Sequence, residues 1–329
     1  MIDLSINYLG LKLKNPIIIA SSGLSNSIEK IKKLEENGAG AIVLKSLFEE
    51  QLIAEYSQGK NSTVNIGYNV ENYISSHIGN NSIEKYINLI KEAKAKISIP
   101  IIASINCIDD KEWTNWAKKF EDAGADALEI NLSILPSDES KNALEVEKMI
   151  FAILKKIRQA VEIPIALKMS LYSTTLATMV KTISLTHNVN GIVLFNRFYN
   201  PDIDIENMKV TSSNVFSNST DNGTTLRWLS ILSPIVDNNV DLIATTGIHN
   251  GETVVKQLLA GATAVQIASA IYIHGPEIIL VMLKVLEDWM IRHNFKSVSE
   301  FKGKLSFNPN NNTVAFERIQ FMKHFGGIE

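Results

Sequence analysis

Short apolar runs alternate with longer amphipathic segments along most of the chain. The runs have the length and composition of buried strands and occupy residues 17–20, 41–45, 101–106, 127–131, 165–169, 191–196, 242–246 and 264–268. Segments with helical spacing of apolar residues lie at 27–37, 82–95, 110–123, 141–161, 174–187, 225–238, 251–259 and 276–292. Ser27 at a helix start, and Gly38, Gly124 and Gly261 just after helix ends, are typical caps. The pattern predicts eight strand–helix units in succession.

Strands that are apolar throughout are typical of a parallel sheet covered on both faces. Eight even units favour closure into an α/β (β/α)8 TIM barrel over an open doubly wound sheet. No G-x-G-x-x-G follows the first strand, as a dinucleotide-binding version of the open sheet would need. We therefore expect a single domain over 1–329, with a hairpin lid at 3–15 and a polar tail at 301–329 that wraps around the barrel.

Two connections are longer than ordinary strand-to-helix loops. Residues 46–81 follow the second strand, and residues 197–224 follow the sixth. Because active sites of such barrels are built at the carboxyl ends of the strands, both insertions are candidate lids.

Charge and composition narrow the class of partner. The 329 residues carry 32 basic and 35 acidic side chains, and a net charge of −3 gives no electrostatic footprint for nucleic acid. The single cysteine, Cys107, excludes an intramolecular disulfide and an iron–sulfur cluster held by this chain alone. No apolar stretch reaches the ~18 residues of a membrane span, and no secretory signal is visible. We expect a cytoplasmic protein that binds a small molecule.

The spacing of the histidines gives no indication of a metal site. The six histidines lack the spacing of metal ligands, so no metal site is expected. Only His77 lies in the first candidate lid.

Polar residues stand at the carboxyl ends of the predicted strands, where barrel side chains point into a shared site. Lys45 and Lys168 are unexpected there, because a lysine is rarely buried without an anion, an electron-accepting ring or a carboxylate such as Glu129 beside it. The segments 245–251 and 267–270 are placed to offer backbone N–H groups to a phosphate. The rim comprises Ser21, Ser22, Lys45, Ser46, Asn106, Glu129, Asn131, Ser133, Lys168, Ser170, Asn196, Arg197, Thr245, Thr246 and Ser269.

Several motifs around this rim resemble those of one enzyme family. They are NPIIIASSG at 15–23, AIVLKS at 41–46, LEINLS at 128–133, IPIALKMS at 163–170, LFNR at 194–197 and the run 243–276. Together, and in this order, they resemble the dihydroorotate dehydrogenase family of FMN-dependent barrels, and the chain is closest in size to its soluble class 1 enzymes. The resemblance covers residues 3–289.

The resemblance implies FMN as cofactor and a flavin site at the barrel mouth. Ser21, Ser46 and Phe195 would contact the flavin, and Lys45 would lie between flavin and substrate with a catalytic role. Lys168 would face the electron-accepting end of the isoalloxazine ring.

Substrate, phosphate and subunit contacts are implied in the same way. Asn131 and Asn196 would hydrogen-bond a pyrimidine-like, carboxylated substrate, and a homodimer is the implied assembly. The FMN phosphate would be held by Thr246, Gly247, Ala268 and Ser269.

The chain departs from the family pattern at the catalytic base. The family has a cysteine or serine three residues beyond the position of Asn131, where this chain has Ile134, and an isoleucine cannot abstract a proton. A general base contributes about 10²- to 10⁴-fold to the rate. Ser133, in phase with Asn131, is the preferred substitute. The alternatives are Ser137, Asp138 and Cys107, of which Cys107 is expected to point away from the site.

Two further departures concern binding. NVENYISSHIGN at 69–80 replaces the family's asparagine–serine–x–glycine substrate loop, and Thr246 and Ala268 stand where the family has phosphate-site glycines. Arg197 would either suit a substrate carboxylate or pair with Asp202 or Asp204.

The leading hypothesis is an FMN-dependent oxidoreductase acting on a carbon–carbon bond, with dihydroorotate or a related small acid as substrate, in pyrimidine biosynthesis. The alternative is a flavin-binding or non-catalytic relative that has lost this activity through Ile134. A third hypothesis is a Schiff-base aldolase using Lys45 or Lys168.

Overall fold

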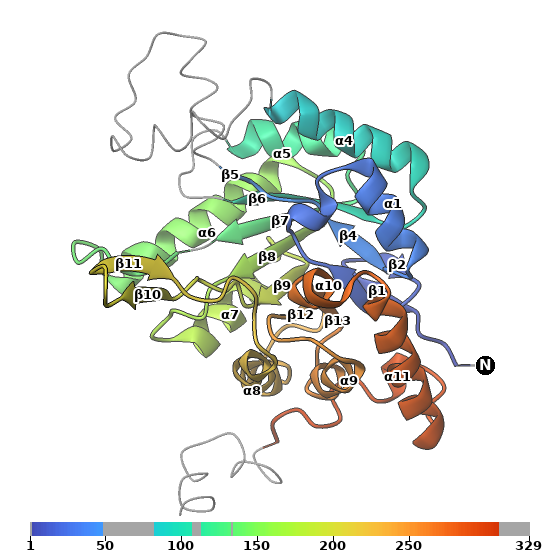
Figure 1. Ribbon diagram of the computed structural model, residues 1–329. Helices are drawn as coiled ribbons and strands as arrows, with labels where there is room; N and C mark the ends of the chain where they lie inside the picture. Colours follow the sequence, from blue (N-terminus) through green and yellow to red (C-terminus); the bar gives the residue numbers. More distant parts are fainter. Residues whose placement is uncertain (1, 49–81, 107–112, 133, 309–329) are drawn as a thin grey trace, which may run out of the picture.

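Eight parallel strands close into a barrel surrounded by helices in the computed structural model, which describes residues 2–48, 82–106, 113–132 and 134–308 (Figure 1). The (β/α)8 prediction is therefore confirmed. Around the ring, β4 pairs with β6 at one junction and β13 pairs with β3 at another, so no barrel edge is left open. In ring order the strands are β3 (Ile17–Ile19), β4 (Ala41–Val43), β6 (Ile101–Asn106), β7 (Ala127–Leu132), β8 (Ile165–Met169), β9 (Gly191–Leu194), β12 (Asp241–Thr245) and β13 (Ala264–Ile267).

The helices cover the outside of the barrel in the expected order. Ser27 caps the first helix by accepting from the Lys30 N–H, and Gly38, Gly124 and Gly261 have positive φ after helix ends, as predicted. The helices are α1 (Ile28–Glu36), α4 (Ser82–Lys96), α5 (Trp113–Asp122), α6 (Ala143–Ala160), α7 (Leu176–Leu185), α8 (Asn222–Leu232), α9 (Gly251–Leu259), α10 (Ser269–His274) and α11 (Ile278–Arg292).

Two helices differ from the prediction. The predicted helix 225–238 begins earlier, at Asn222, and ends at Leu232, because Pro234 cannot continue the hydrogen-bond ladder. The short helix α10, directly after the last barrel strand, was not predicted, because six residues are too few to show helical periodicity.

Successive residues along each strand belong to two different cores. Ile17 and Ile19 pack outward between barrel and helices, whereas Ile18 packs inside the barrel. The inner core contains several alanines, and these small side chains leave room for the fully buried Tyr8. This alternation explains why the strands are apolar on both faces.

An amino-terminal hairpin closes the bottom of the barrel. β1 (Ile6–Tyr8) and β2 (Leu11–Leu13) pair antiparallel, which confirms the predicted hairpin. The Leu9 N–H donates to the Asp241 carboxylate at 2.8 Å, and a Cβ at Gly191 would lie 2.7 Å from the Leu9 side chain. Asp241 and Gly191 begin β12 and β9. The predicted hairpin lid therefore closes the barrel at the amino ends of the strands.

The two insertions and the tail are only partly described. From the first insertion, β5 (Leu47–Phe48) extends the sheet beside β6, and residues 49–81 lie outside the described part. In the second insertion, β10 (Pro201–Asp204) and β11 (Lys209–Ser212) form a hairpin at the edge of the molecule (Figure 1). Residues 301–308 run along α8 and α9, with hydrogen bonds to Ser230, Leu258 and Leu259. No described helix is long and apolar enough to cross a membrane.

Candidate active site

A cavity of about 770 Å³ opens at the carboxyl ends of the barrel strands. Residues at the ends of all eight strands line it, and its volume is in the range of small-molecule sites. Ser133 lies outside the described residues. The candidate residues that line this cavity are Ser21, Ser22, Lys45, Ser46, Asn106, Asn131, Lys168, Phe195, Asn196, Arg197, Thr245, Thr246, Gly247, Ala268 and Ser269. Glu129 and Ser170, which also stand at the predicted rim, do not line it.

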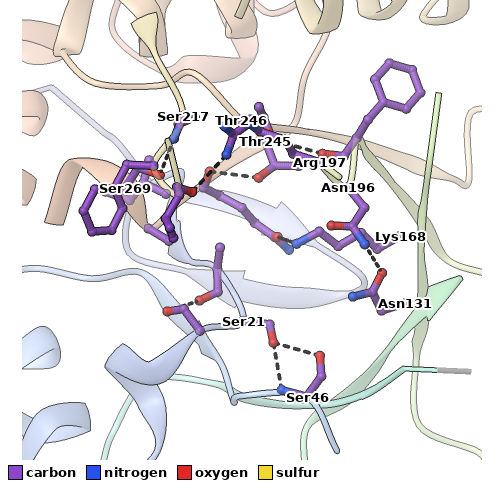
Figure 2. A pocket seen from close by; sticks show the side chains of 18 of the residues that line it. Ser21, Ser46, Asn131, Lys168, Asn196, Arg197, Ser217, Thr245, Thr246 and Ser269 are labelled. Atoms are coloured by element: carbon purple, nitrogen blue, oxygen red, sulfur yellow. Dashed lines mark hydrogen bonds between the residues drawn. The ribbon is translucent and has the colours of Figure 1, made fainter. Parts of the chain in front are cut away.

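One side of the cavity carries two amides and a buried ammonium (Figure 2). The Asn196 side-chain N–H donates to the Asn131 Oδ1 at 2.8 Å. The Lys168 side chain is 6% exposed; its Nζ donates to the Gln266 Oε1 at 3.3 Å and lies 3.7 Å from the Glu129 carboxylate. The carboxylate that the sequence offered as a partner for a strand-end lysine thus lies beside Lys168.

Lys45 differs from the prediction, because it does not end a buried strand. β4 ends at Val43, and the Lys45 side chain is exposed. It lines both the main cavity and a neighbouring one of about 560 Å³ between α1 and α4. An exposed cation at the cavity wall can reach an anionic ligand without the desolvation that a buried lysine undergoes.

Buried hydroxyl groups continue from the cavity wall into the core. The Ser21 Oγ lies 2.9 Å from the Ser46 Oγ (Figure 2). The Ser46 Oγ lies 2.8 Å from the Ser104 Oγ. The Ser104 N–H donates to the Tyr86 hydroxyl at 2.8 Å, and burial raises the pKa of Tyr86. Ser104 and Tyr86 were missed from the sequence, although a serine inside the apolar run 101–106 is a usable signal.

The opposite side of the cavity is formed by backbone and hydroxyl groups (Figure 2). Thr246 and Gly247 both have left-handed backbone, at φ +75° and +76°. A Cβ at Gly247 would lie 2.3 Å from the Asn222 nitrogen, so only glycine fits there. Ala268 and Ser269 begin α10, whose first N–H groups lack intrahelical partners. This side can bind an anion.

Ser217 joins the loops on this side and was not predicted. Its N–H donates to the Ser269 Oγ at 3.0 Å, and its Oγ accepts from the Gly247 N–H at 3.3 Å. The same hydroxyl lies 3.1 Å from a ring nitrogen of His249, and burial lowers the pKa of that imidazole. Ser217 comes from the second insertion, which has no helical or strand-like periodicity from which its position could be predicted.

Arg197 holds the two ends of the second insertion together. Its guanidinium donates to the carbonyl oxygens of Asn214 at 2.8 Å and Val215 at 2.9 Å, and its Nε lies 3.7 Å from the Asp221 carboxylate. The predicted pairing with Asp202 or Asp204 is wrong, since both belong to the projecting hairpin.

Ile134 does not line the main cavity. Its side chain lines a second cavity of about 530 Å³, beside α6 and the ends of β7 and β8, and its carbonyl oxygen accepts from the Ser170 Oγ at 2.9 Å. Ser137 and Asp138 are exposed and do not line the main cavity either. Hydrogen bonds from Ser140 hold the pKa of Asp138 below its usual value.

Acid–base groups are scarce around the main cavity. Across residues 2–48, 82–106, 113–132 and 134–308, no cysteine, histidine, aspartate or glutamate side chain lines it. Cys107, His77, the segment 69–80 and Ser133 lie outside these residues. A cysteine, histidine or carboxylate that abstracts a proton would therefore have to come from outside the described part of the wall.

Comparison with known proteins finds relatives along nearly the whole chain. The family model for dihydroorotate dehydrogenase matches residues 3–290. The catalytic subunit of dihydroorotate dehydrogenase B (NAD(+)) from Thermoplasma volcanium is 28% identical, covering 92% of this chain and 98% of the relative. The subunit of that name from Methanocaldococcus jannaschii is 26% identical, covering 84% and 89%. A putative dihydroorotate dehydrogenase A (fumarate) from Aeropyrum pernix is 25% identical, covering 92% and 97%.

Proposed function

The chain belongs to the dihydroorotate dehydrogenase family, and from that premise we propose that it is an FMN-dependent oxidoreductase that oxidises dihydroorotate to orotate in pyrimidine biosynthesis. The observation that carries the proposal is a single cavity lined by the described residues proposed to bind flavin and substrate. Because its lining runs from Ala20 to Tyr272, we also propose that the chain acts as one domain.

The residues present fit an FMN. The phosphate needs N–H and hydroxyl donors, which the left-handed turn at Gly247, Ser217 and the start of α10 at Ser269 offer together. The ring needs a flat wall and a cation near its electron-accepting end, and we propose Ser21 with Ser46 for the wall and Lys168 for the cation. The family is flavin-dependent in general, and the bound flavin supplies the chemistry of a two-electron acceptor.

Asn131 and Asn196 would bind the pyrimidine ring. An asparagine side-chain amide can both donate and accept hydrogen bonds, and both residues line the cavity. That capacity suits the alternating carbonyl and N–H groups of a cyclic amide. The exposed Lys45 is proposed to meet the substrate between this pair and the flavin, with its charge towards the substrate carboxylate.

Arg197 is a weaker candidate for the carboxylate. Its guanidinium already contacts Asn214, Val215 and Asp221 in the second insertion, so it has less capacity for a ligand than the Lys45 ammonium. We propose that it shapes the substrate wall of the cavity, to which it contributes.

Dihydroorotate oxidation also requires removal of a proton. Ser133 remains the proposed base, because it follows Asn131 by two residues and the described wall offers no carboxylate, thiol or imidazole. A serine needs activation by its surroundings to act as a base, so we expect catalysis slower than with a cysteine.

A second candidate function follows from Ile134. Its side chain lines the second cavity, so the residue at the family's base position is both apolar and turned away from the main cavity. This favours a relative that binds FMN but does not oxidise dihydroorotate.

Turnover separates the two candidates. Purified protein with FMN would be assayed for orotate formation with NAD⁺, fumarate and an artificial dye as acceptors, because the names of the relatives differ in the acceptor. We expect orotate formation with at least the dye, and a loss of about 10²- to 10⁴-fold in Ser133→Ala with FMN content unchanged. FMN-loaded protein that forms no orotate with any acceptor would favour the second candidate.

A further inference from the structure

Three polar side chains cross the barrel directly below the cavity. Glu129 comes from β7 and Gln266 from β13, which are four strands apart in either direction around the ring. The Gln266 side-chain N–H donates to the Glu129 Oε2, and the Gln266 Oε1 accepts from the Lys168 Nζ at 3.3 Å. The Lys168 Nζ lies 3.7 Å from the Glu129 Oε1. The three groups therefore form a closed triangle.

Because all three side chains of this triangle are buried, their charged and polar groups interact strongly with one another. Glu129 and Gln266 are 0% exposed and Lys168 is 6% exposed. A buried carboxylate requires a charged or hydrogen-bonding partner, and within the described part of the chain the only ion pair of Glu129 is with Lys168. Its Oε1 accepts no hydrogen bond from a described residue, so the lysine charge is its main compensation.

The Glu129 charge lies between the buried hairpin plug and the cavity. Below Glu129 the hairpin plug buries Tyr8, and burial, followed by the negative charges of Glu129 and Asp241, raises the pKa of the Tyr8 hydroxyl. Above it, Lys168 and Gln266 line the cavity, whereas Glu129 does not. Glu129 therefore acts on a cavity ligand through Lys168 and Gln266.

We propose that Glu129 is a positioning residue that sets how readily a bound flavin is reduced, because it orients Lys168 and neutralises part of its charge. Reduction adds negative charge to the flavin, and an ammonium beside the ring stabilises that charge. A carboxylate close behind the ammonium cancels part of its field. This inference rests on the proposed function, in which Lys168 faces the electron-accepting end of the ring.

The test is the reduction potential of bound FMN. Wild type, Glu129→Gln and Glu36→Gln would each be equilibrated anaerobically with a reference dye, and reduced flavin would be read from the visible spectrum. Glutamine at position 129 keeps the side-chain shape and a hydrogen bond to Gln266 but removes the charge. We expect the oxidised-to-reduced equilibrium to shift about tenfold towards reduced flavin in Glu129→Gln, about 30 mV for two electrons. Glu36, exposed on α1 outside the barrel, is the control with no expected shift.

Shifts of opposite sign in Glu129→Gln and Lys168→Gln would distinguish an effect of charge from an effect of loosened packing. Lys168→Gln removes the stabilising ammonium and is expected to shift the same equilibrium towards oxidised flavin, whereas loosened packing would move both variants in one direction. If Glu129→Gln does not fold, Glu129→Asp withdraws the carboxylate from Lys168 and is expected to shift the equilibrium in the direction given for Gln, by less.

Failure of the inference and failure of the proposed function have different signatures. An unchanged or more negative potential in FMN-loaded Glu129→Gln, or no shift in FMN-loaded Glu129→Asp, would overturn the inference alone. A wild-type protein that binds no FMN would overturn the proposed function, and with it the premise of this test.

Discussion

Lys168 and Lys45 follow the same sequence pattern, an apolar run that ends in a lysine, yet only Lys168 is buried. The difference arises from register. Lys168 pairs with Asn131 across β7 and β8, which places Glu129 on the neighbouring strand within reach of its ammonium, whereas β4 ends before Lys45. Sequence named both partners of the ion pair but could not give the register that joins them.

Asn196 gives a direct test of substrate binding. Asn196→Ala removes an amide that bonds to Asn131 and lines the cavity, so we expect the KM for dihydroorotate to rise about tenfold, the effect of one or two lost hydrogen bonds. FMN content should not change. Steady-state kinetics with a dye acceptor measures this.

Asn239→Ala is the matched control, because Asn239 bonds to Asp237 in a turn before β12 and does not line the cavity. An unchanged KM in Asn196→Ala, or an equal rise in both variants, would remove Asn196 from the substrate site.

Carboxylates at helix ends fix the entry of the chain into the next strand. The Glu35 carboxylate in α1 accepts from the Ser98 N–H at 2.7 Å, the Ser98 Oγ at 2.6 Å and the Ile99 N–H at 3.3 Å, just before β6. Burial would raise the pKa of Glu35, but these hydrogen bonds outweigh it and lower the pKa below its usual value. Glu121 in α5 does the same for Glu162 and Ile163, ahead of β8.

The lowered pKa of Glu35 predicts a pH-dependent contribution to stability. A carboxyl whose folded pKa is depressed stabilises the fold above its unfolded value of ~4.5 and loses this contribution as pH falls through the folded pKa. Relative to wild type, Glu35→Gln should lower the free energy of unfolding by about 1 kcal/mol at pH 7, discounted for partial exposure, and by less below pH 4. Urea unfolding at both pH values measures the difference.

Glu36→Gln is the control for the same helix, since Glu36 is exposed and its ion pair with Lys32 is long, at 3.9 Å. We expect no measurable change there. A Glu35→Gln effect that is equal at both pH values would show that the lost charge is not its cause.

Helix and strand positions followed from sequence because each barrel unit repeats one pattern. The runs 101–106 and 165–169 match β6 and β8, and 251–259 matches α9. The sequence did not predict side-chain positions in loops, because loops have no periodic pattern of apolar residues. Ile134 lies in a loop whose direction depends on contacts such as the Ser170 hydrogen bond, and Ser217 reaches the site from an insertion without a repeating pattern.

At the scale of the whole molecule, the β10–β11 hairpin carries several exposed apolar side chains. Ile203 and Val210 are cross-strand partners, 65% and 77% exposed, and Met208 beside them is 89% exposed. Two-stranded hairpins are marginally stable alone, and exposed apolar patches mark interaction surfaces. We propose that a second copy of this chain covers the hairpin, in line with the expected homodimer.

Sedimentation tests this assembly. Wild type should sediment as a dimer at micromolar concentration, and the double variant Ile203→Asp with Val210→Asp as a folded monomer. Ile291→Asp is the control, because Ile291 is similarly exposed, at 54%, but lies on α11. A monomeric wild type, or a double variant that remains dimeric, would contradict the proposed interface.

The central claim, a flavoenzyme acting on dihydroorotate, is tested most directly by an anaerobic visible spectrum of the purified protein before and after addition of dihydroorotate. The account predicts an FMN band that bleaches on mixing, because the cavity brings the proposed flavin and substrate residues together. A band that persists would contradict dihydroorotate as the substrate. The absence of any bound flavin, even after addition of FMN, would contradict the oxidoreductase itself.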